Sequence, residues 1–257
     1  MAVSCTVEDG VALIVFDRPP ANAYDATMLI ELTQAVHRVA DDPAARVAIL
    51  KSANPKFFCT GADISVLQTA TPASFANFLT IAQESVDAIA RTPKLFIAAI
   101  SGHCIGGGLE IALGCDFRFA AQGKYRFGLA EVNLGLSPGM GGTQRLPRLI
   151  PKSRALRMMV TGETLVPDEA LALGIVDRVF PEASFESEVM AEAKKLAAGP
   201  TMAQGYIKLS VNNGLETSLA QGLAIERAHQ NQLFGSDDVQ EGLKAFLEKR
   251  PAQFAGK

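Results

Sequence analysis

Short apolar runs alternate with helix-like segments over the first 180 residues of this 257-residue chain, and this alternation limits the possible folds more than any other feature. Runs at 11–16, 47–50, 95–100 and 117–120 have the length of buried strands. Strands that are separated by helices usually pair in parallel, with helices covering the faces of the sheet. The sequence therefore predicts an α/β fold with a mainly parallel sheet.

The segments between the runs have the spacing of helices. Asp25 or Thr27 can cap a helix that extends to about Ala40 with its apolar residues on one face, and a longer helix is expected over 72–91. The last strand is expected at 175–180.

Only helical patterns remain after the last strand. We therefore divide the chain into an α/β domain over residues 1–195 and a helical region over residues 196–257.

Charge and composition exclude several classes of protein. The formal net charge is −3 and no run of Lys or Arg occurs, which disfavours binding to nucleic acid or to an anionic membrane. No apolar segment reaches the roughly 20 residues of a membrane-spanning helix, and the N-terminus carries acids where a signal peptide has basic residues. The four cysteines form no C-x-x-C pair and the three histidines are scattered, so no metal site is expected. We expect a soluble cytoplasmic protein with free thiols.

One motif suggests a hydrolase but does not fit that chemistry. Residues 135–139 read G-x-S-x-G, the pattern of a nucleophile elbow. That mechanism takes an oxyanion-hole N–H from the residue after the serine, and here that residue is Pro138, which has none. A Pro-Gly turn is the better interpretation.

Three glycines at 106–108 stand between an apolar strand and an apolar helix. Glycine permits close backbone approach, and the N–H groups at a helix N-terminus attract phosphate or a developing oxyanion. Close packing of helix on strand is the alternative explanation. Neither a P-loop nor a dinucleotide fingerprint is present.

Two glutamates lie among apolar residues. Glu110 stands two residues after the last of the glycines, where a favourable interaction with the helix dipole is the alternative explanation. Glu131 lies in the apolar segment 127–135. A carboxyl group that is removed from water has a raised pKa and is suited to proton transfer. Two such groups can supply a base and an acid to one substrate.

The segment 57–64 contains a turn that could face the same substrate. Gly61 permits the turn, Asp63 can cap the following helix, and the N–H of Ala62 can then point into a cavity. An ordinary strand-to-helix turn explains the spacing equally well.

Taken together, these segments resemble the crotonase (enoyl-CoA hydratase/isomerase) superfamily over nearly the whole chain. The matching segments, in chain order, are 18–23, 60–64, 102–110, 127–131, 138–146, 170–176 and 246–250. The resemblance implies a crotonase-like ββα spiral core with a C-terminal helical trimerisation region, and a homotrimer or a hexamer built as a dimer of trimers. It implies an acyl-CoA substrate, with coenzyme A as part of that substrate and no separate cofactor. It also places the thioester oxygen between the N–H groups of Ala62 and Gly107.

With glutamate at both positions, Glu110 and Glu131, the chain resembles the family members that add water to 2-enoyl-CoA. The resemblance therefore implies hydration at C2=C3 as the expected reaction. The sequence leaves open which carboxyl group removes the proton from water and which delivers a proton to C2. We take Glu131 as the principal acid/base and Glu110 as the partner that orients water.

The resemblance also implies a CoA-binding set made of residues near the nucleotide, pantetheine and thioester. This set is Ala23, Lys56, Thr60, Ala62, Asp63, Ile64, Ser65, Phe246 and Lys249. The last two usually reach in from a neighbouring subunit, and solvated surface lysines are the alternative for Lys56 and Lys249. Thr60 replaces the more common alanine, and Tyr24 is an unusual residue beside the nucleotide region. Phe75, Phe78 and Leu79 are expected to border the acyl pocket.

Two other functions stay open. An enoyl-CoA isomerase, or another crotonase-type reaction, is the first, and turnover of 3-enoyl-CoA without turnover of 2-enoyl-CoA would identify it. A non-catalytic CoA-binding or assembly protein is the second, but it has no need of paired buried acids.

Overall fold

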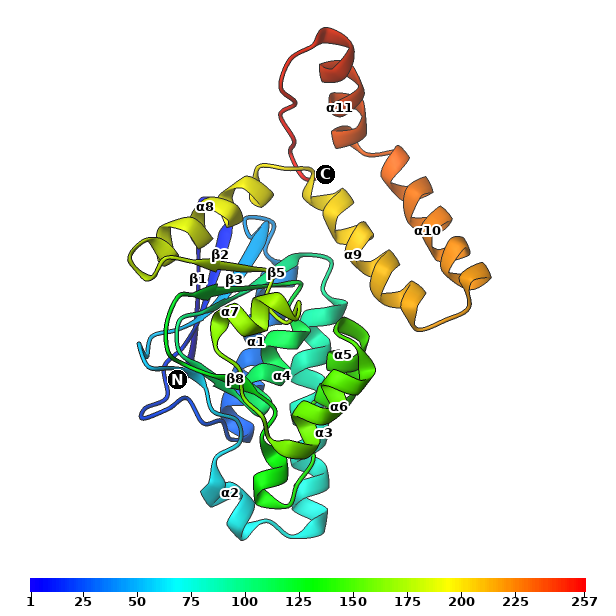
Figure 1. The fold of residues 1–257 in the computed structure, drawn as a ribbon. Coiled ribbons are helices and arrows are strands. Elements are labelled where there is room, and N and C mark those ends of the chain that lie inside the picture. Colours follow the sequence, from blue (N-terminus) through cyan, green and yellow to red (C-terminus); the bar gives the residue numbers. More distant parts are fainter.

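A computed structural model describes all 257 residues and contains two sheets (Figure 1). The large sheet has the strand order β1-β2-β3-β5-β7-β9, and the small sheet has the order β4-β6-β8. β1 pairs antiparallel with β2, and every other pair is parallel. The strands are β1 Val3–Glu8, β2 Val11–Phe16, β3 Val47–Ser52, β4 Phe57–Cys59, β5 Leu95–Ile100, β6 His103–Ile105, β7 Phe117–Ala121, β8 Phe127–Gly128 and β9 Arg178–Phe180. The predicted α/β fold with a mainly parallel sheet is therefore confirmed.

The two sheets are built from a repeated unit. β3 and β4, β5 and β6, and β7 and β8 each place one strand in the large sheet and the next strand in the small sheet. The three strands of the small sheet are parallel, so β4, β6 and β8 all end at the same edge of that sheet. The segment that follows each strand starts there. Three sequence-distant segments thereby meet at one place.

Eleven α-helices and two short 3₁₀ helices, η1 and η2, complete the fold. Their bounds are α1 Ala26–Asp41, α2 Ile64–Thr69, α3 Pro72–Arg91, α4 Gly107–Gly114, η1 Glu131–Leu134, α5 Gly142–Leu149, α6 Lys152–Thr161, α7 Pro167–Ala172, η2 Glu182–Ser184, α8 Phe185–Ala197, α9 Thr201–Leu215, α10 Leu219–Phe234 and α11 Asp237–Glu248. The predicted cap of α1 is Asp25, whose carboxylate accepts the N–H of Met28 at 2.9 Å. The helix expected over 72–91 is α3, capped by Thr71.

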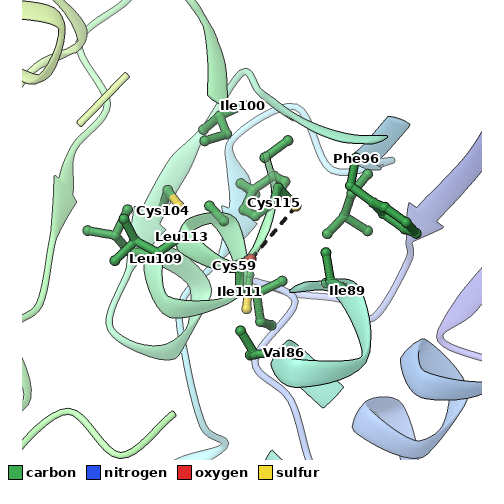
Figure 2. Packing of buried hydrophobic residues seen from close by; sticks show 14 of the residues in the cluster. Cys59, Val86, Ile89, Phe96, Ile100, Cys104, Leu109, Ile111, Leu113 and Cys115 are labelled. Atoms are coloured by element: carbon green, nitrogen blue, oxygen red, sulfur yellow. Dashed lines mark hydrogen bonds between the residues drawn. The ribbon is translucent and has the colours of Figure 1, made fainter. Parts of the chain in front are cut away.

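Both faces of the large sheet are buried. Alternate residues of β2 and β3 contribute to a large apolar cluster on the side of α1, α3 and α4, and to a smaller cluster beneath α8. Figure 2 shows part of the larger cluster, which includes Leu109, Ile111 and Leu113 of α4 and Val86 and Ile89 of α3. Every residue of α4 is buried. The helix that carries Glu110 is therefore enclosed by the rest of the protein along its whole length.

The close packing of α4 leads to a prediction about Gly108. A Cβ atom on Gly108 would lie 2.1 Å from the carbonyl oxygen of Cys59, so alanine would push α4 away from β4. We expect Gly108→Ala to lower the free energy of unfolding by about 1–3 kcal/mol, as overpacking in a core usually does. Denaturant unfolding measures this change. Gly214→Ala in α9 is the matched control, because its Cβ would approach no closer than 3.8 Å to Gly222 and should not destabilise the fold. Equal stability of both variants would contradict the prediction.

The C-terminal helices extend away from the sheets (Figure 1). α9 is attached by the buried Lys208, whose Nζ donates to the carbonyl oxygens of Ile89 and Lys94 and to the carboxylate of Asp116, at 2.8–2.9 Å. The helical C-terminal region is confirmed, whereas the division at residues 195 and 196 stays a prediction and falls inside α8. No helix combines the length and the apolar character that crossing a bilayer requires.

The structure differs from the expected strands in three respects, the first of which is β1, a strand that no apolar run predicted. The strand expected at 175–180 begins only at Arg178, because Gly174 adopts a positive φ of 80° and the chain turns through the next residues. The short strands of the small sheet were not predicted, since two or three residues are too few to show a period.

Candidate active site

A mainly apolar cavity of about 140 Å³ lies at the edge of the small sheet where β4, β6 and β8 end. Its wall includes the turn after β4, the start of α4, η1 and one side of α3. Glu110 and Glu131 both line it, together with Ala62 and Gly107. Phe75, Phe78 and Leu79, expected at the acyl pocket, also line this cavity.

Glu110 is a buried carboxylate with a fixed orientation. It is only 2% exposed, and its Oε1 accepts the N–H groups of Met140 and Gly142, both at 2.7 Å. Burial raises the pKa of Glu110, while these two N–H groups stabilise its anion and oppose the increase. Arg145 holds the loop that supplies the donors, because it donates to the carbonyl oxygen of Met140 at 2.9 Å and pairs with Asp87. The two donors therefore fix the orientation of the Glu110 carboxyl group within the cavity wall.

Glu131 has a different environment. Both of its carboxyl oxygens are buried and have no hydrogen-bond partner. Burial raises the pKa of Glu131 to about 7, against a smaller opposing effect of its own nearby backbone N–H, and the negative charge of Glu110 also favours its protonated form. A Cβ atom on Gly106 would lie 3.2 Å from Oε1 of Glu131, which places this carboxyl group over the start of α4. Near neutral pH, Glu131 can both give and accept a proton.

Two backbone N–H groups are available at the same cavity. The N–H of Ala62 makes no hydrogen bond within the protein, and Gly107 opens α4, so its N–H has no acceptor inside the helix. A Cβ atom on Gly61 would lie 3.3 Å from the Gly107 nitrogen, which shows that the two segments are in contact. Gly61 itself has a φ of 94°, a conformation that glycine adopts readily. Two backbone N–H groups without an acceptor thus lie on neighbouring segments of one cavity wall.

The residues predicted to bind CoA are found in three places. Thr60 and Ile64 line the cavity with Ala62. Asp63 caps α2, accepts hydrogen bonds from Ser65 and pairs with Arg18, whose guanidinium also donates to the carbonyl oxygen of Ala23. These contacts join the start of α2 to the segment before α1.

The other three predicted CoA-binding residues lie outside the cavity. Lys56 is exposed, with its ammonium group 5.3 Å from the centre of the Phe57 ring. Phe246 and Lys249 belong to the end of α11, which Figure 1 places at the opposite end of the molecule from α2. Phe246 is 83% exposed. One chain does not bring these two residues to its own cavity, so their contact with a neighbouring subunit's cavity stays a prediction.

Sequence reasoning missed several features of the site. The donors to Glu110 come from the segment 138–146, which was recognised as a motif without a role. Tyr24 was placed beside the nucleotide region, but its side chain lies in the cavity wall and its hydroxyl group contacts Sδ of Met140 at 2.7 Å. No local sequence pattern reveals either contact. In each case the two residues belong to separate segments and lie 30 or more positions apart along the chain.

Comparison with known proteins shows which family the chain belongs to. Residues 6–257 match the family model described as enoyl-CoA hydratase/isomerase. The chain is 37% identical to a crotonyl-CoA hydratase of Syntrophomonas wolfei, covering 97% of this chain and 96% of the relative. It is 36% identical to an (E)-benzylidenesuccinyl-CoA hydratase of Thauera aromatica over the full length of both. A crystal structure of an enoyl-CoA hydratase from Geobacillus kaustophilus superimposes with a TM-score of 0.97 at 44% identity, covering 100% of this chain and 97% of that one. The chain therefore belongs to the enoyl-CoA hydratase/isomerase family.

Proposed function

We propose that this protein is an enoyl-CoA hydratase, which adds water reversibly across the C2=C3 bond of a 2-enoyl-CoA thioester. The observation that supports this most directly is the pair of buried carboxyl groups, Glu110 and Glu131, on one cavity with two free backbone donors. An isomerase needs one proton-transferring group to move a double bond. Addition of water uses two, one for each proton that moves.

The proposed mechanism starts with the thioester. Its oxygen accepts hydrogen bonds from the N–H groups of Ala62 and Gly107, which stabilise the enolate that forms when hydroxide adds to C3. Ionised Glu110 orients the water and takes its proton, while protonated Glu131 delivers a proton to C2. In this proposal the two carboxyl groups, which line the same cavity, act on one face of the double bond, and the addition is syn.

The oligomeric state belongs to the same proposal. Large apolar side chains are exposed on the helices after α8, at Ile207, Val211, Leu215, Leu219, Leu223, Phe234, Leu243, Phe246 and Leu247. Exposed apolar surface of this extent is typical of protein interfaces. We propose that these helices join copies of the chain into a homotrimer or a dimer of trimers, and that Phe246 and Lys249 thereby approach the CoA of a neighbouring subunit.

The first test is the loss of conjugated-enoyl absorbance when the purified protein is mixed with crotonyl-CoA. We expect rapid loss, with 3-hydroxybutyryl-CoA as the product. If the protein binds crotonyl-CoA without consuming it but converts a 3-enoyl-CoA to the conjugated isomer, the hydratase proposal is wrong and the isomerase takes its place. Binding without any turnover would favour a non-catalytic CoA-binding protein.

The pH dependence follows from the proton that the two glutamates share. Hydration needs Glu110 ionised and Glu131 protonated, and burial raises the pKa of Glu131 to about 7. Deprotonation of Glu131 removes the acid, so kcat/KM should fall as the pH rises through about 7. Dehydration starts with Glu110 protonated and Glu131 ionised, so the two glutamates together again carry one proton. The pH profile of kcat/KM for dehydration should therefore superimpose on that for hydration. An increase in kcat/KM above this pH would contradict the assignment of Glu131 as the acid.

A further inference from the structure

Tyr24 places a hydroxyl group in a cavity wall that is otherwise mainly apolar. The residue is 4% exposed, and the only hydrogen-bond partner of its hydroxyl is the thioether sulfur of Met140. A thioether is a weak acceptor, whereas a buried tyrosine hydroxyl usually has a good one. Tyr125 shows the usual case, because its hydroxyl meets the carbonyl oxygens of Ile100 and Ala121 at 2.8 and 2.5 Å. The hydroxyl of Tyr24 thus lacks a strong acceptor within the protein.

The position of the Tyr24 ring is fixed by the segment that carries Ala62. The N–H of Tyr24 donates to the carbonyl of Gly61 at 2.9 Å, and the N–H of Asp63 donates to the carbonyl of Tyr24 at 2.8 Å. The ring also stacks on Phe78, with 6.1 Å between the ring centres. The two hydrogen bonds lie on either side of Ala62. They therefore fix the position of the phenol relative to the Ala62 N–H.

The hydroxyl group is directed at the start of α4. A Cβ atom on Gly107 would lie 1.8 Å from the hydroxyl oxygen of Tyr24, so the phenol occupies the space that a side chain at this position would need. Burial raises the pKa of Tyr24, and the negative charges of Glu110 and Glu131 raise it further. The group therefore remains a protonated phenol at all pH values at which the protein works, and it can act as a donor.

We propose that Tyr24 is a further catalytic residue, whose hydroxyl group donates a third hydrogen bond to the thioester oxygen beside the N–H groups of Ala62 and Gly107. When the thioester binds, the O–H of Tyr24 donates to the thioester carbonyl oxygen instead of the sulfur of Met140. The carbonyl oxygen is the better acceptor, and it becomes better still as the enolate forms. This assignment rests on the proposed binding of acyl-CoA, but it does not depend on whether water is then added.

The test uses acetoacetyl-CoA, whose enolate absorbs light separately from its keto form and which has no double bond to hydrate. We expect the wild-type protein to favour the bound enolate. Tyr24→Phe removes only the hydroxyl group, and it should lower the equilibrium constant for enolate formation and kcat for crotonyl-CoA by about 100-fold each, as loss of one oxyanion donor does. KM should change little, because the bond strengthens mainly in the enolate. Tyr125→Phe is the matched control: it should reduce thermal stability and leave the bound enolate unchanged.

Each other outcome has a defined meaning. Unchanged enolate formation in Tyr24→Phe overturns the proposal, even if kcat falls, because the hydroxyl group would then act away from the thioester oxygen. Absence of any bound enolate in the wild-type protein overturns it as well. The wild-type protein could stabilise the enolate through Tyr24 without hydrating crotonyl-CoA. That result would support the role of Tyr24 and contradict only the proposed hydratase function.

Discussion

Replacement of Glu131 by glutamine is expected to lower kcat for hydration of crotonyl-CoA by about 1,000-fold, within the range that general acid–base catalysis contributes. Glutamine has almost the same shape as glutamate but cannot deliver a proton to C2. Both oxygens of Glu131 lack partners in the structure, so the change breaks no hydrogen bond and the fold should be preserved. Single-turnover measurement of enoyl absorbance separates this loss from any change in binding.

The control for Glu131→Gln is the same substitution at Glu192, which pairs with Arg178 far from the cavity lining. Glu192→Gln should retain full activity, and affinity for butyryl-CoA should be similar in all three proteins. Near-normal turnover by Glu131→Gln would refute the two-carboxylate mechanism.

Glu110→Gln is expected to lower hydration by a comparable factor, about 1,000-fold, through loss of the group that takes a proton from water. The amide oxygen of glutamine can still accept the N–H groups of Met140 and Gly142, so the loop keeps its anchor. Thermal unfolding should therefore stay close to that of the wild-type protein, whereas Glu110→Ala should be less stable because both donors are left without an acceptor.

Exchange of the C2 hydrogen atoms of butyryl-CoA with deuterium separates the roles of the two glutamates. This exchange needs a base at C2 and a stabilised enolate, but no addition of water. We expect Glu131→Gln to abolish the exchange and Glu110→Gln to retain most of it. The reverse pattern would exchange the roles assigned to the two residues.

The sequence was sufficient to predict the fold class and the parts of the site that follow strands directly. Apolar runs predicted the large sheet because its strands are buried on both faces and so appear as continuous apolar segments. Glu110 and Glu131 were found because each lies among apolar neighbours within its own segment.

What could not be predicted depends on contacts between distant segments. The anchoring of Glu110 by Met140 and Gly142 joins α4 to a loop about 30 residues later. The orientation of Tyr24 depends on pairing with the segment at Ala62, which no periodicity reveals. Such contacts arise only once the repeated units have packed together.

The three strands of the small sheet each lead to one part of the site. The turn after β4 carries Ala62, the helix after β6 carries Gly107 and Glu110, and the 3₁₀ helix after β8 begins with Glu131. In the proposed mechanism the first two units therefore recognise the thioester, while the third delivers the proton that ends the life of the enolate. On that mechanism, a substitution confined to the third unit would redirect the reaction without loss of the shared intermediate, so that one scaffold supports several different outcomes.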